Sequence, residues 1–230
     1  MRTLICRVPN LRFSKFQEEW KNFKLSDIAV KVGKKNSDNK INVVFSNSAI
    51  QGIVLQNEYF DKDIANKENL NGYYIVENND FVYNPRLSLN AKVGAMSVNR
   101  TKLTGLVSPL YMVFRLNSNS VENSFLEYLF KSKAWHSHMR SVANQGARDD
   151  RMNVKDEDFF ALPLIIPQKE EQAKIAHLLQ FIDDRISTQI QIIDNLQSLI
   201  KGLIQYFVFG NRIGWKKQYL RDLLIERVVL

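Results

Sequence analysis

Apolar residues recur at alternating intervals of three and four through the C-terminal part of the chain. This spacing is the heptad seam of a coiled coil, and it holds for four repeats with one polar position at Gln189. The seam positions are Leu179, Ile182, Ile186, Gln189, Ile193, Leu196, Ile200, Leu203 and Phe207. The pattern therefore predicts one helix from Gln168 to about Phe209.

A single helix of this kind cannot cover its own seam, so the pattern predicts a partner helix. At 1.5 Å per residue, about forty residues would span roughly 60 Å, whereas a domain of this size is only about 25–30 Å wide. Ile190, Ile192, Leu199 and Ile204 widen the stripe, so a third surface could pack there as well. A long core helix within a compact domain is the alternative, which the length of the helix weakens.

Between Trp20 and about Phe160 the pattern changes to that of a mixed α/β domain. Short runs rich in β-branched and aromatic residues alternate with Asn, Gly and Pro, as strands alternate with turns. The expected strands are residues 41–46, 51–56, 72–76, 80–84, 106–116 and 162–166.

Helical spacing interrupts these runs twice. It favours a short helix near residues 20–32 and a longer one over residues 122–143. The expected inner positions are Phe23, Ile28 and Ala29 in the first helix, and Phe125, Leu129, Trp135 and Met139 in the second. Pro167 marks the boundary between the last expected strand and the long helix.

The composition narrows the class of protein. The net charge is +8 and the sequence pI is about 9.5, a surplus that favours nucleic acid or another anionic surface. Cys6 is the single cysteine, which argues against a disulfide framework and a cysteine-based zinc site. The sequence shows no secretory signal and no apolar run of about 18 residues, so we expect no membrane span and a cytoplasmic location.

The sequence also repeats itself across the long helix. Residues 20–28, WKNFKLSDI, and residues 215–223, WKKQYLRDL, share Trp, Lys, Leu, Asp and a branched apolar residue at the same places. The chain therefore begins its first domain a second time after the helix.

Several segments resemble the specificity (S) subunits of type I restriction-modification systems. VPNLRFSKFQEEWKNFKLSDI (8–28) is similar to the start of that family, and YNPRLSLNAKVGAMSV and GLVSPLYMVFR resemble segments of its target recognition domains. LPLIIPQKEEQAKIAHLLQFIDDRI (162–186) resembles the junction between such a domain and a conserved helix. The most specific marks of this junction are Pro167, Glu171-Gln172, Ile175 and Ile182-Asp183. The resemblance covers nearly the whole chain.

The resemblance implies an α+β target recognition domain over residues 1–167, followed by a long coiled-coil helix over 168–210 and a short tail over 211–230. S subunits of this family usually have two recognition domains and two such helices, which pair antiparallel so that a bipartite DNA sequence is read. This chain resembles a half-size S subunit, so bipartite recognition would need two chains. We expect a homodimer that reads an interrupted palindrome. The tail would pack across the dimer, or else be a frayed remnant.

The same resemblance implies the partners. Adenine-N6 methyltransferase (M) subunits would carry S-adenosylmethionine, and restriction (R) subunits would carry the ATP-driven steps, so no cofactor is expected on this chain. The residues agree with a non-catalytic role. Asn84-Pro85 is followed by Arg86 rather than by a second proline, and the sequence has no Walker-type loop. His136 and His138 lie two positions apart on an expected helix and face different sides, so no metal site is expected.

Three groups of residues carry side chains suited to DNA. Arginine can bind guanine with two hydrogen bonds, asparagine and glutamine can do the same with adenine, and lysine neutralises phosphate. The first two groups are Asn84, Arg86, Ser88, Asn90 and Lys92, and Asn144, Gln145, Arg148, Arg151 and Asn153. The third group, Lys31, Lys34 and Lys35, suits phosphate better than bases. Solvated polar loops are the ordinary alternative for all three.

Two other functions fit the same residues. The chain could be a structural coiled-coil protein whose basic surface is incidental. It could also be the recognition part of a split DNA methyltransferase. Binding to duplex DNA and methyl transfer by the purified chain would separate these possibilities from a specificity subunit.

Overall fold

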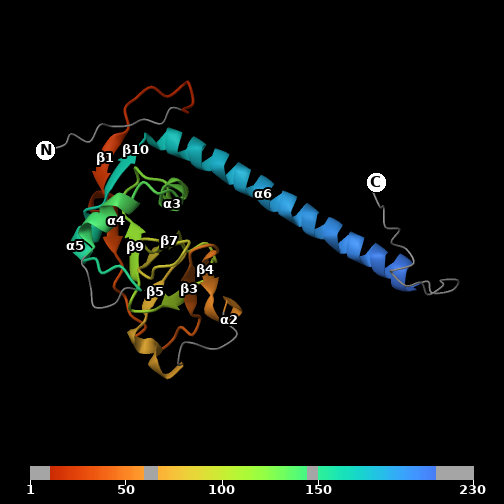
Figure 1. Ribbon diagram of the computed structural model, residues 1–230. Helices are drawn as coiled ribbons and strands as arrows, with labels where there is room; N and C mark the ends of the chain where they lie inside the picture. Colours follow the sequence, from red (N-terminus) through yellow and green to blue (C-terminus); the bar gives the residue numbers. More distant parts are fainter. Residues whose placement is uncertain (1–10, 60–66, 144–149, 211–230) are drawn as a thin grey trace, which may run out of the picture. The chain divides into compact units, whose positions relative to one another are not determined.

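The computed structural model describes residues 11–59, 67–143 and 150–210, and the chain forms two compact units. The first unit, Met1–Leu179, is a mixed α+β domain that includes the start of the long helix (Figure 1). The second unit, Gln180–Leu230, contains the rest of that helix. This is the fold class that the sequence predicts, an α+β domain followed by one long helix.

The largest sheet of the first unit has four antiparallel strands. Their order is β2 (Ala29–Lys31), β9 (Met112–Leu116), β6 (Phe81–Asn84) and β7 (Ala95–Val98). Side chains alternate between its two faces, as the pleat of a strand requires. Phe81 and Phe114 belong to the larger core, whereas Val82 and Val113 belong to a second core. Both faces are covered, and so every residue of β6 is buried.

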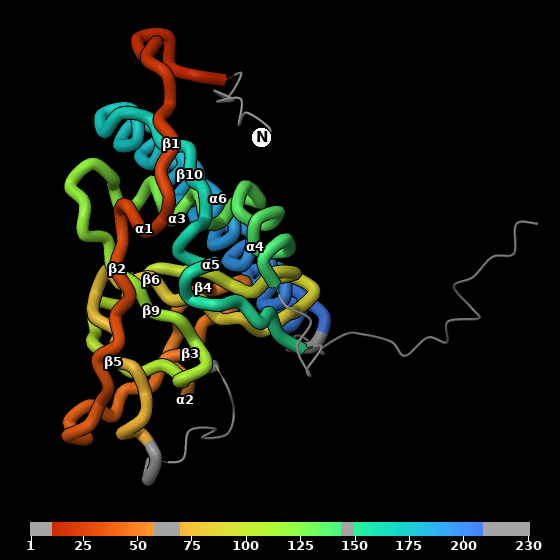
Figure 2. Tube along the Cα trace, turned by 90° about the vertical axis from the view of Figure 1, so that its left-hand side faces the viewer, coloured from red at the N-terminus to blue at the C-terminus, as the bar shows by residue number. Residues whose placement is uncertain are grey.

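Three two-stranded antiparallel sheets accompany the four-stranded sheet. They are β1 (Lys21–Lys24) with β10 (Pro163–Ile166), β3 (Phe45–Ser48) with β4 (Gly52–Leu55), and β5 (Tyr74–Val76) with β8 (Gly105–Val107). Phe45, Ile53, Val76 and Val107 pack in the second core with Val82 and Val113. Strands β1 and β10 lie side by side although they come from opposite ends of the domain sequence (Figure 2).

Helices pack against the four-stranded sheet and contribute many side chains to the larger core. They are α1 (Leu25–Ile28), α3 (Asn123–Lys131), α4 (His136–Val142) and α5 (Asp156–Phe160); α2 (Gln56–Tyr59) and the 3-10 helix η1 (Lys67–Gly72) are short connections. Aromatic rings fill the centre of this core, where Phe81 stacks on Phe114 with ring centroids 5.2 Å apart. The indole N–H of Trp135 donates to the carbonyl oxygen of Phe130 at 2.9 Å, so the buried polar atom of this side chain is paired.

Three sequence predictions of local structure were wrong. Residues 106–116 form two strands in different sheets, because a turn in which Tyr111 N–H donates to the Ser108 carbonyl separates β8 from β9. The helix expected over 122–143 is two helices, since the backbone N–H of Ser132 closes α3 on the carbonyls of Tyr128 and Leu129. Residues 21–24 are the strand β1 rather than a helix, because they pair with β10.

Other expected strands differ mainly in their ends. The strand predicted over 162–166 is β10, and those predicted over 72–76 and 80–84 are β5 and β6. The run at 41–46 becomes a strand only from Phe45, and β7 was not among the expected strands. Phe125, Trp135 and Met139 are buried, as expected, and Leu129 packs partly buried against the same core.

The long helix α6 (Lys169–Ile204) begins within the first unit, where two buried polar side chains hold it. Glu171 is fully buried and accepts two hydrogen bonds from the guanidinium of Arg12, both 2.7 Å long. The Gln172 amide donates to the carbonyls of Ser120 and Pro167 at 2.8 and 2.9 Å. Its oxygen accepts from the N–H of Glu122 at 2.8 Å. The Glu171-Gln172 pair therefore anchors the first turn of the helix to the domain.

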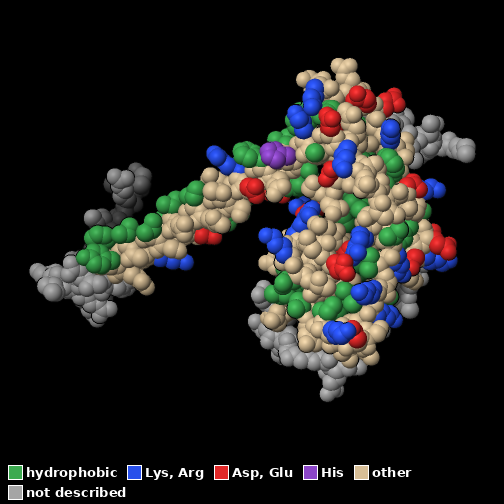
Figure 3. Space-filling view, turned by 180° about the vertical axis from the view of Figure 1, so that it is seen from behind, with side chains coloured by type: hydrophobic (Ala, Val, Ile, Leu, Met, Phe, Trp, Pro, Cys, Tyr) green, Lys and Arg blue, Asp and Glu red, His purple; other side chains and the backbone are tan. Residues whose placement is uncertain are grey.

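The remainder of α6 carries a continuous stripe of exposed apolar side chains. The helix has 36 residues and ends in a π-helical stretch, η2 (Gln205–Gly210). Figure 3 shows hydrophobic side chains following one another along it. Within the described part of the chain, no helix is long and apolar enough to cross a membrane.

Candidate nucleic-acid interface

Two of the polar stretches predicted to contact DNA lie against each other in the first unit. Arg86 and Arg151 form an antiparallel β-bridge. On one side of it, the Leu87 N–H donates to the Asp150 carbonyl at 2.9 Å. On the other side, the Met152 N–H donates to the Pro85 carbonyl at 2.9 Å. Main-chain hydrogen bonds therefore join residues 85–87 to residues 150–152, although the two segments are far apart in the sequence.

The first stretch borders a polar depression of about 440 Å³. The walls of this depression are the β3–β4 hairpin, residues 84–91 and residues 108–111. Arg86, Ser88 and Asn90 are exposed on its rim. Asn84 is buried instead, because its amide donates to the Asn47 carbonyl at 3.1 Å and its oxygen accepts from the Arg86 N–H at 3.0 Å. Asn84 therefore shapes the loop, and its polar atoms face inward.

A second depression, of about 320 Å³, lies beside the first and shares Leu110 and Tyr111 with it. Lys31, Arg151 and Asn153 line it, so residues from two of the predicted groups meet there. Lys31 forms an ion pair with Asp156, and Arg151 contacts Asp150 at 3.4 Å. Burial raises the pKa of Tyr111 above its ordinary value, so the phenol on this shared wall stays neutral even in alkaline solution.

The other predicted DNA contacts are scattered. Lys34, Lys35 and Lys92 are exposed and line neither depression. The ammonium of Lys35 lies over the Tyr74 ring, 6.0 Å from its centroid. Asn144, Gln145 and Arg148 lie outside the described residues.

Several arginines form ion pairs with acidic residues of the domain itself. Arg115 contacts the fully buried carboxylate of Asp80 at 2.6 Å and the carboxylate of Glu77 at 2.8 Å. Arg12 is paired with Glu171. The basic surplus of the chain is therefore only partly available to a ligand, and Figure 3 shows lysine and arginine interspersed with acidic side chains on one face.

The β3–β4 hairpin is a wall of the first depression that the sequence did not single out. Its base is held by Asn47, whose amide donates to the carbonyls of Val82 and Ala95 at 2.8 and 3.1 Å. The Asn47 oxygen accepts from the Ser97 hydroxyl at 2.8 Å. Asn47-Ser48 was visible in the sequence as a turn signal, but nothing local indicated that the turn would stand beside Arg86.

The histidines show no arrangement for metal binding. The Nε2 atom of His138 lies 2.8 Å from the Asp158 carbonyl oxygen, which is a structural contact. No group of three or more His, Cys, Asp or Glu side chains within residues 11–59, 67–143 and 150–210 is placed to hold a metal ion.

The predicted dimer contacts lie along α6 and, for Phe207, in the π-helical stretch η2. Leu179 is half-buried in the first unit, and the positions that follow it in the seam are exposed in this chain. These exposed positions are Ile182, Ile186, Gln189, Ile193, Leu196, Ile200, Leu203 and Phe207.

Comparisons with known proteins agree with this architecture. Residues 17–198 match the family described as the type I restriction modification DNA specificity domain. The HindI specificity subunit of a type I restriction enzyme from Haemophilus influenzae is 27% identical over 208 residues, which are 89% of this chain and 44% of that protein. The chain therefore spans about half the length of this relative.

Solved structures share the fold. The HsdS subunit from Thermoanaerobacter tengcongensis aligns with a TM-score of 0.55 at 16% identity, over 86% of this chain and 51% of that one. The S subunit of a type I restriction-modification system from M. genitalium aligns with a TM-score of 0.51 at 13% identity, over 85% and 47% of the two chains. With a family match that spans both the α+β domain and most of α6, the chain belongs to the type I restriction modification DNA specificity domain family.

Proposed function

We propose that this chain is a half-size specificity subunit, which selects the DNA sequence on which a type I restriction-modification system acts. The observation that carries the proposal is the specificity-domain match over residues 17–198. The adjoining depressions support it, because Arg86, Asn90 and Arg151 offer the donors and acceptors that read base edges. As a specificity domain, the chain is non-catalytic. The proposed DNA contacts are Lys31, Lys34, Lys35, Arg86, Ser88, Lys92, Gln145, Arg148, Arg151 and Asn153. Asn84, which the sequence also suggested, is buried and would instead hold the Arg86 loop in place.

The proposed division of labour follows the sequence. Residues 1–167 would read DNA, residues 168–210 would pair with a second copy, and residues 211–230 would pack across that pair. M subunits with S-adenosylmethionine and R subunits with ATP would dock on the dimer and supply the chemistry. A location in the cytoplasm, where the DNA and these partners are found, fits the single cysteine.

A homodimer is proposed because the described residues contain one recognition domain and one apolar helical seam, which is exposed. Two identical readers related by a two-fold axis would read identical half-sites in inverted orientation. The target would then be an interrupted palindrome, with the helices setting the gap between the half-sites.

The test is duplex-DNA binding by the purified chain at several salt concentrations. A specificity subunit should bind with a steep salt dependence, since each phosphate contact contributes a slope of about −0.9 to log K against log salt. It should also prefer particular sequences over random DNA. Flat, weak binding without sequence preference would refute the proposal and favour a structural coiled-coil protein.

A methyl-transfer assay addresses the split-methyltransferase alternative. The chain alone, supplied with S-adenosylmethionine and duplex DNA, should give no turnover, whereas addition of an M subunit should restore it. Turnover by the chain alone would contradict the assignment as a non-catalytic subunit.

A further inference from the structure

The tip of the β3–β4 hairpin is held in one shape. The Ser48 hydroxyl oxygen accepts hydrogen bonds from the backbone N–H groups of Ile50 and Gln51, both 3.3 Å long. Gly52 follows with a backbone φ of +72°, a conformation that residues other than glycine rarely adopt. Asn47 fixes the base of the hairpin to β6 and β7. The tip is therefore organised before any ligand arrives, which lowers the entropy cost of binding.

The tip exposes one apolar side chain beside one amide. Ile50 is 77% exposed. Gln51 is exposed as well, and its side chain makes no hydrogen bond to a described residue. Aliphatic side chains contact the methyl group of thymine, and a glutamine amide can pair with N6 and N7 of adenine. A two-stranded β-ribbon also fits the DNA major groove, which is about 12 Å wide.

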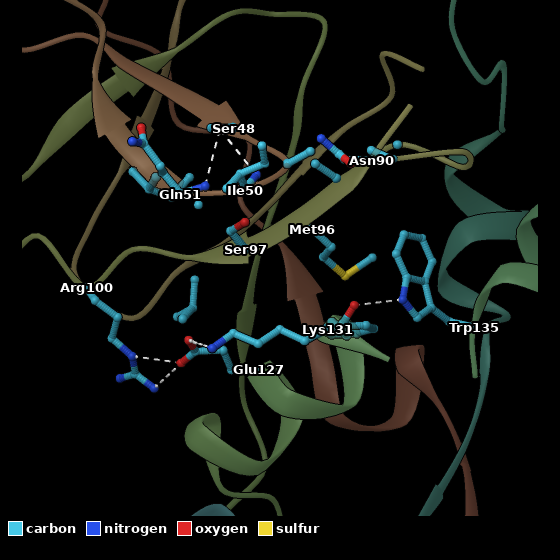
Figure 4. Close-up of a pocket in the computed structure, with 18 of the residues that line it drawn as sticks. Ser48, Ile50, Gln51, Asn90, Met96, Ser97, Arg100, Glu127, Lys131 and Trp135 are labelled. Atoms are coloured by element: carbon cyan, nitrogen blue, oxygen red, sulfur yellow. Dashed lines mark hydrogen bonds and ion pairs between the residues drawn. The ribbon is translucent and has the colours of Figure 1, made fainter. Parts of the chain in front are cut away.

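The hairpin stands between two depressions. One is the polar depression beside Arg86 and Asn90 described above. The other, of about 580 Å³, lies between the hairpin, β7 and the helices α3 and α4 (Figure 4). Ile50 borders both depressions, so a ligand seated over the tip would meet side chains from each.

The second depression is basic. Arg100 and Lys131 both form ion pairs with Glu127, at 3.1 and 3.5 Å (Figure 4). Lys133 is exposed and has no ion pair with a described acidic residue. Burial lowers the pKa of His136, and the nearby cations of Arg140 and Lys133 lower it further because they disfavour a second positive charge. A phosphate group would neutralise this surplus.

We propose that Ile50 and Gln51 read an A·T base pair in each half-site, while Lys133 binds the DNA backbone next to it. The inference rests on the proposed function and extends it to a hairpin outside the stretches at 84–92 and 144–153. The apolar contact would favour thymine, and the amide would favour adenine. Lys133 would add affinity without sequence preference, because phosphate contacts position the protein and do not specify bases.

The experiment selects bound sequences from a random duplex library with the full chain. Gln51→Ala should relax the preference at one A·T position per half-site, by roughly 5- to 150-fold for a well-formed contact with two hydrogen bonds. Ile50→Ala should relax the preference for thymine at that position by a smaller factor. Lys133→Ala should weaken binding to all sequences alike and reduce the slope of log K against log salt by about one. Two variants serve as matched controls. Leu11→Ala removes an aliphatic side chain that is highly exposed, as Ile50 is, and Lys21→Ala removes an exposed lysine on β1. Neither should change the selected sequence or the salt dependence of binding.

The outcomes distinguish failure of the hairpin proposal from failure of the proposed function. If the unmodified chain selects no sequence, the proposed function itself fails. If it selects a sequence and the Ile50 and Gln51 variants select the same one with the same preference, only the hairpin proposal is overturned. An equal loss of affinity on selected and random DNA for these two variants would also overturn base reading by the hairpin. Unchanged melting temperatures would show that the variants remain folded.

Discussion

Glu171 and Gln172 are fully buried at the start of α6, although glutamate and glutamine usually lie at the surface. Each is buried together with its partners. Glu171 is paired with the guanidinium of Arg12. The Gln172 side chain forms hydrogen bonds with three main-chain groups, which are the N–H of Glu122 and the carbonyls of Ser120 and Pro167. A buried polar group that loses its partner destabilises the fold. These contacts therefore explain why a Glu-Gln pair follows Pro167 at the junction.

Gln172→Ala should lower the free energy of unfolding by about 2–4 kcal/mol, because it leaves the Glu122 N–H and the Ser120 and Pro167 carbonyls without this partner. Urea denaturation measures the change. Gln168→Ala is the matched control in the same turn. Among the described residues, its exposed amide contacts only Glu18, at 3.0 Å, and its loss should cost less than about 0.5 kcal/mol. Equal effects of the two substitutions would contradict the anchoring role.

Gly94 is a second residue whose identity the fold requires. Its φ is +88°, and an added Cβ would lie 2.5 Å from the Asn84 carbonyl oxygen and 2.7 Å from the Tyr83 ring. Gly94→Ala should therefore destabilise the domain by about 2 kcal/mol or more. Thermal denaturation would detect this change. Gly33→Ala, where the added methyl group meets open space, should leave the melting temperature nearly unchanged, and a similar loss at both sites would argue against a local steric cause.

At the scale of elements, α6 has a wider apolar face than a two-stranded coiled coil needs. Ile190 and Ile204 follow the seam on one side, and Ile192 and Leu199 follow it on the other. All four are exposed in this chain. One partner helix covers the seam positions and leaves part of both flanks in water. We therefore expect a bundle of more than two helices in the complete assembly.

The seam itself can be tested by charge. Ile186→Glu with Ile193→Glu introduces two carboxylates into the proposed contact, and these would lose hydration on pairing, so the double variant should be monomeric. Sedimentation velocity gives the result directly. Gln191→Glu with Ser198→Glu adds the same charge on the opposite face of the same helix and should stay dimeric. A dimeric seam variant would show that the main contact between copies lies elsewhere.

At the scale of the whole molecule, fewer cationic side chains are free to bind an anion than the net charge of +8 suggests. Arg12 and Arg115 are held by acids of the domain, and Lys31 pairs with Asp156. The cations that remain, such as Arg86 and Lys133, lie near two depressions that flank one hairpin. We therefore expect DNA binding to depend on a few of these side chains rather than on the overall charge.

The target of the assembled protein should be an interrupted palindrome. Two copies related by a two-fold axis present the same hairpin and loops to both half-sites, so the half-sites must be inverted repeats of each other. Methylation mapping in the presence of an M subunit identifies the target. An asymmetric bipartite sequence would contradict a homodimer and would require a second, different recognition domain.

Much of the element structure could be predicted because its signals are local. The three-four spacing from Leu179 to Phe207 predicted α6, and a short apolar run before Pro167 predicted β10. The predictions that failed lacked such a signal. Residues 21–24 extend because β10, far along the chain, offers them hydrogen bonds, and residues 106–116 divide because the two halves join different sheets.

The candidate site divides in the same way. The sequence alone identified polar stretches at 84–92 and 144–153 from the chemistry of their side chains. The tertiary structure brought part of them together through the Arg86–Arg151 bridge, turned Asn84 inward and added the β3–β4 hairpin as a wall of the depression beside Arg86.

The sequence by itself therefore determined the long helix, its apolar seam and the types of side chain available for a ligand, because periodicity and side-chain chemistry are properties of neighbouring residues. Only the tertiary structure decided which strands pair, which polar groups are buried and which loops share a depression. Those outcomes depend on hydrogen bonds and packing between segments far apart in the chain, such as β1 with β10 and Asn47 with β6 and β7.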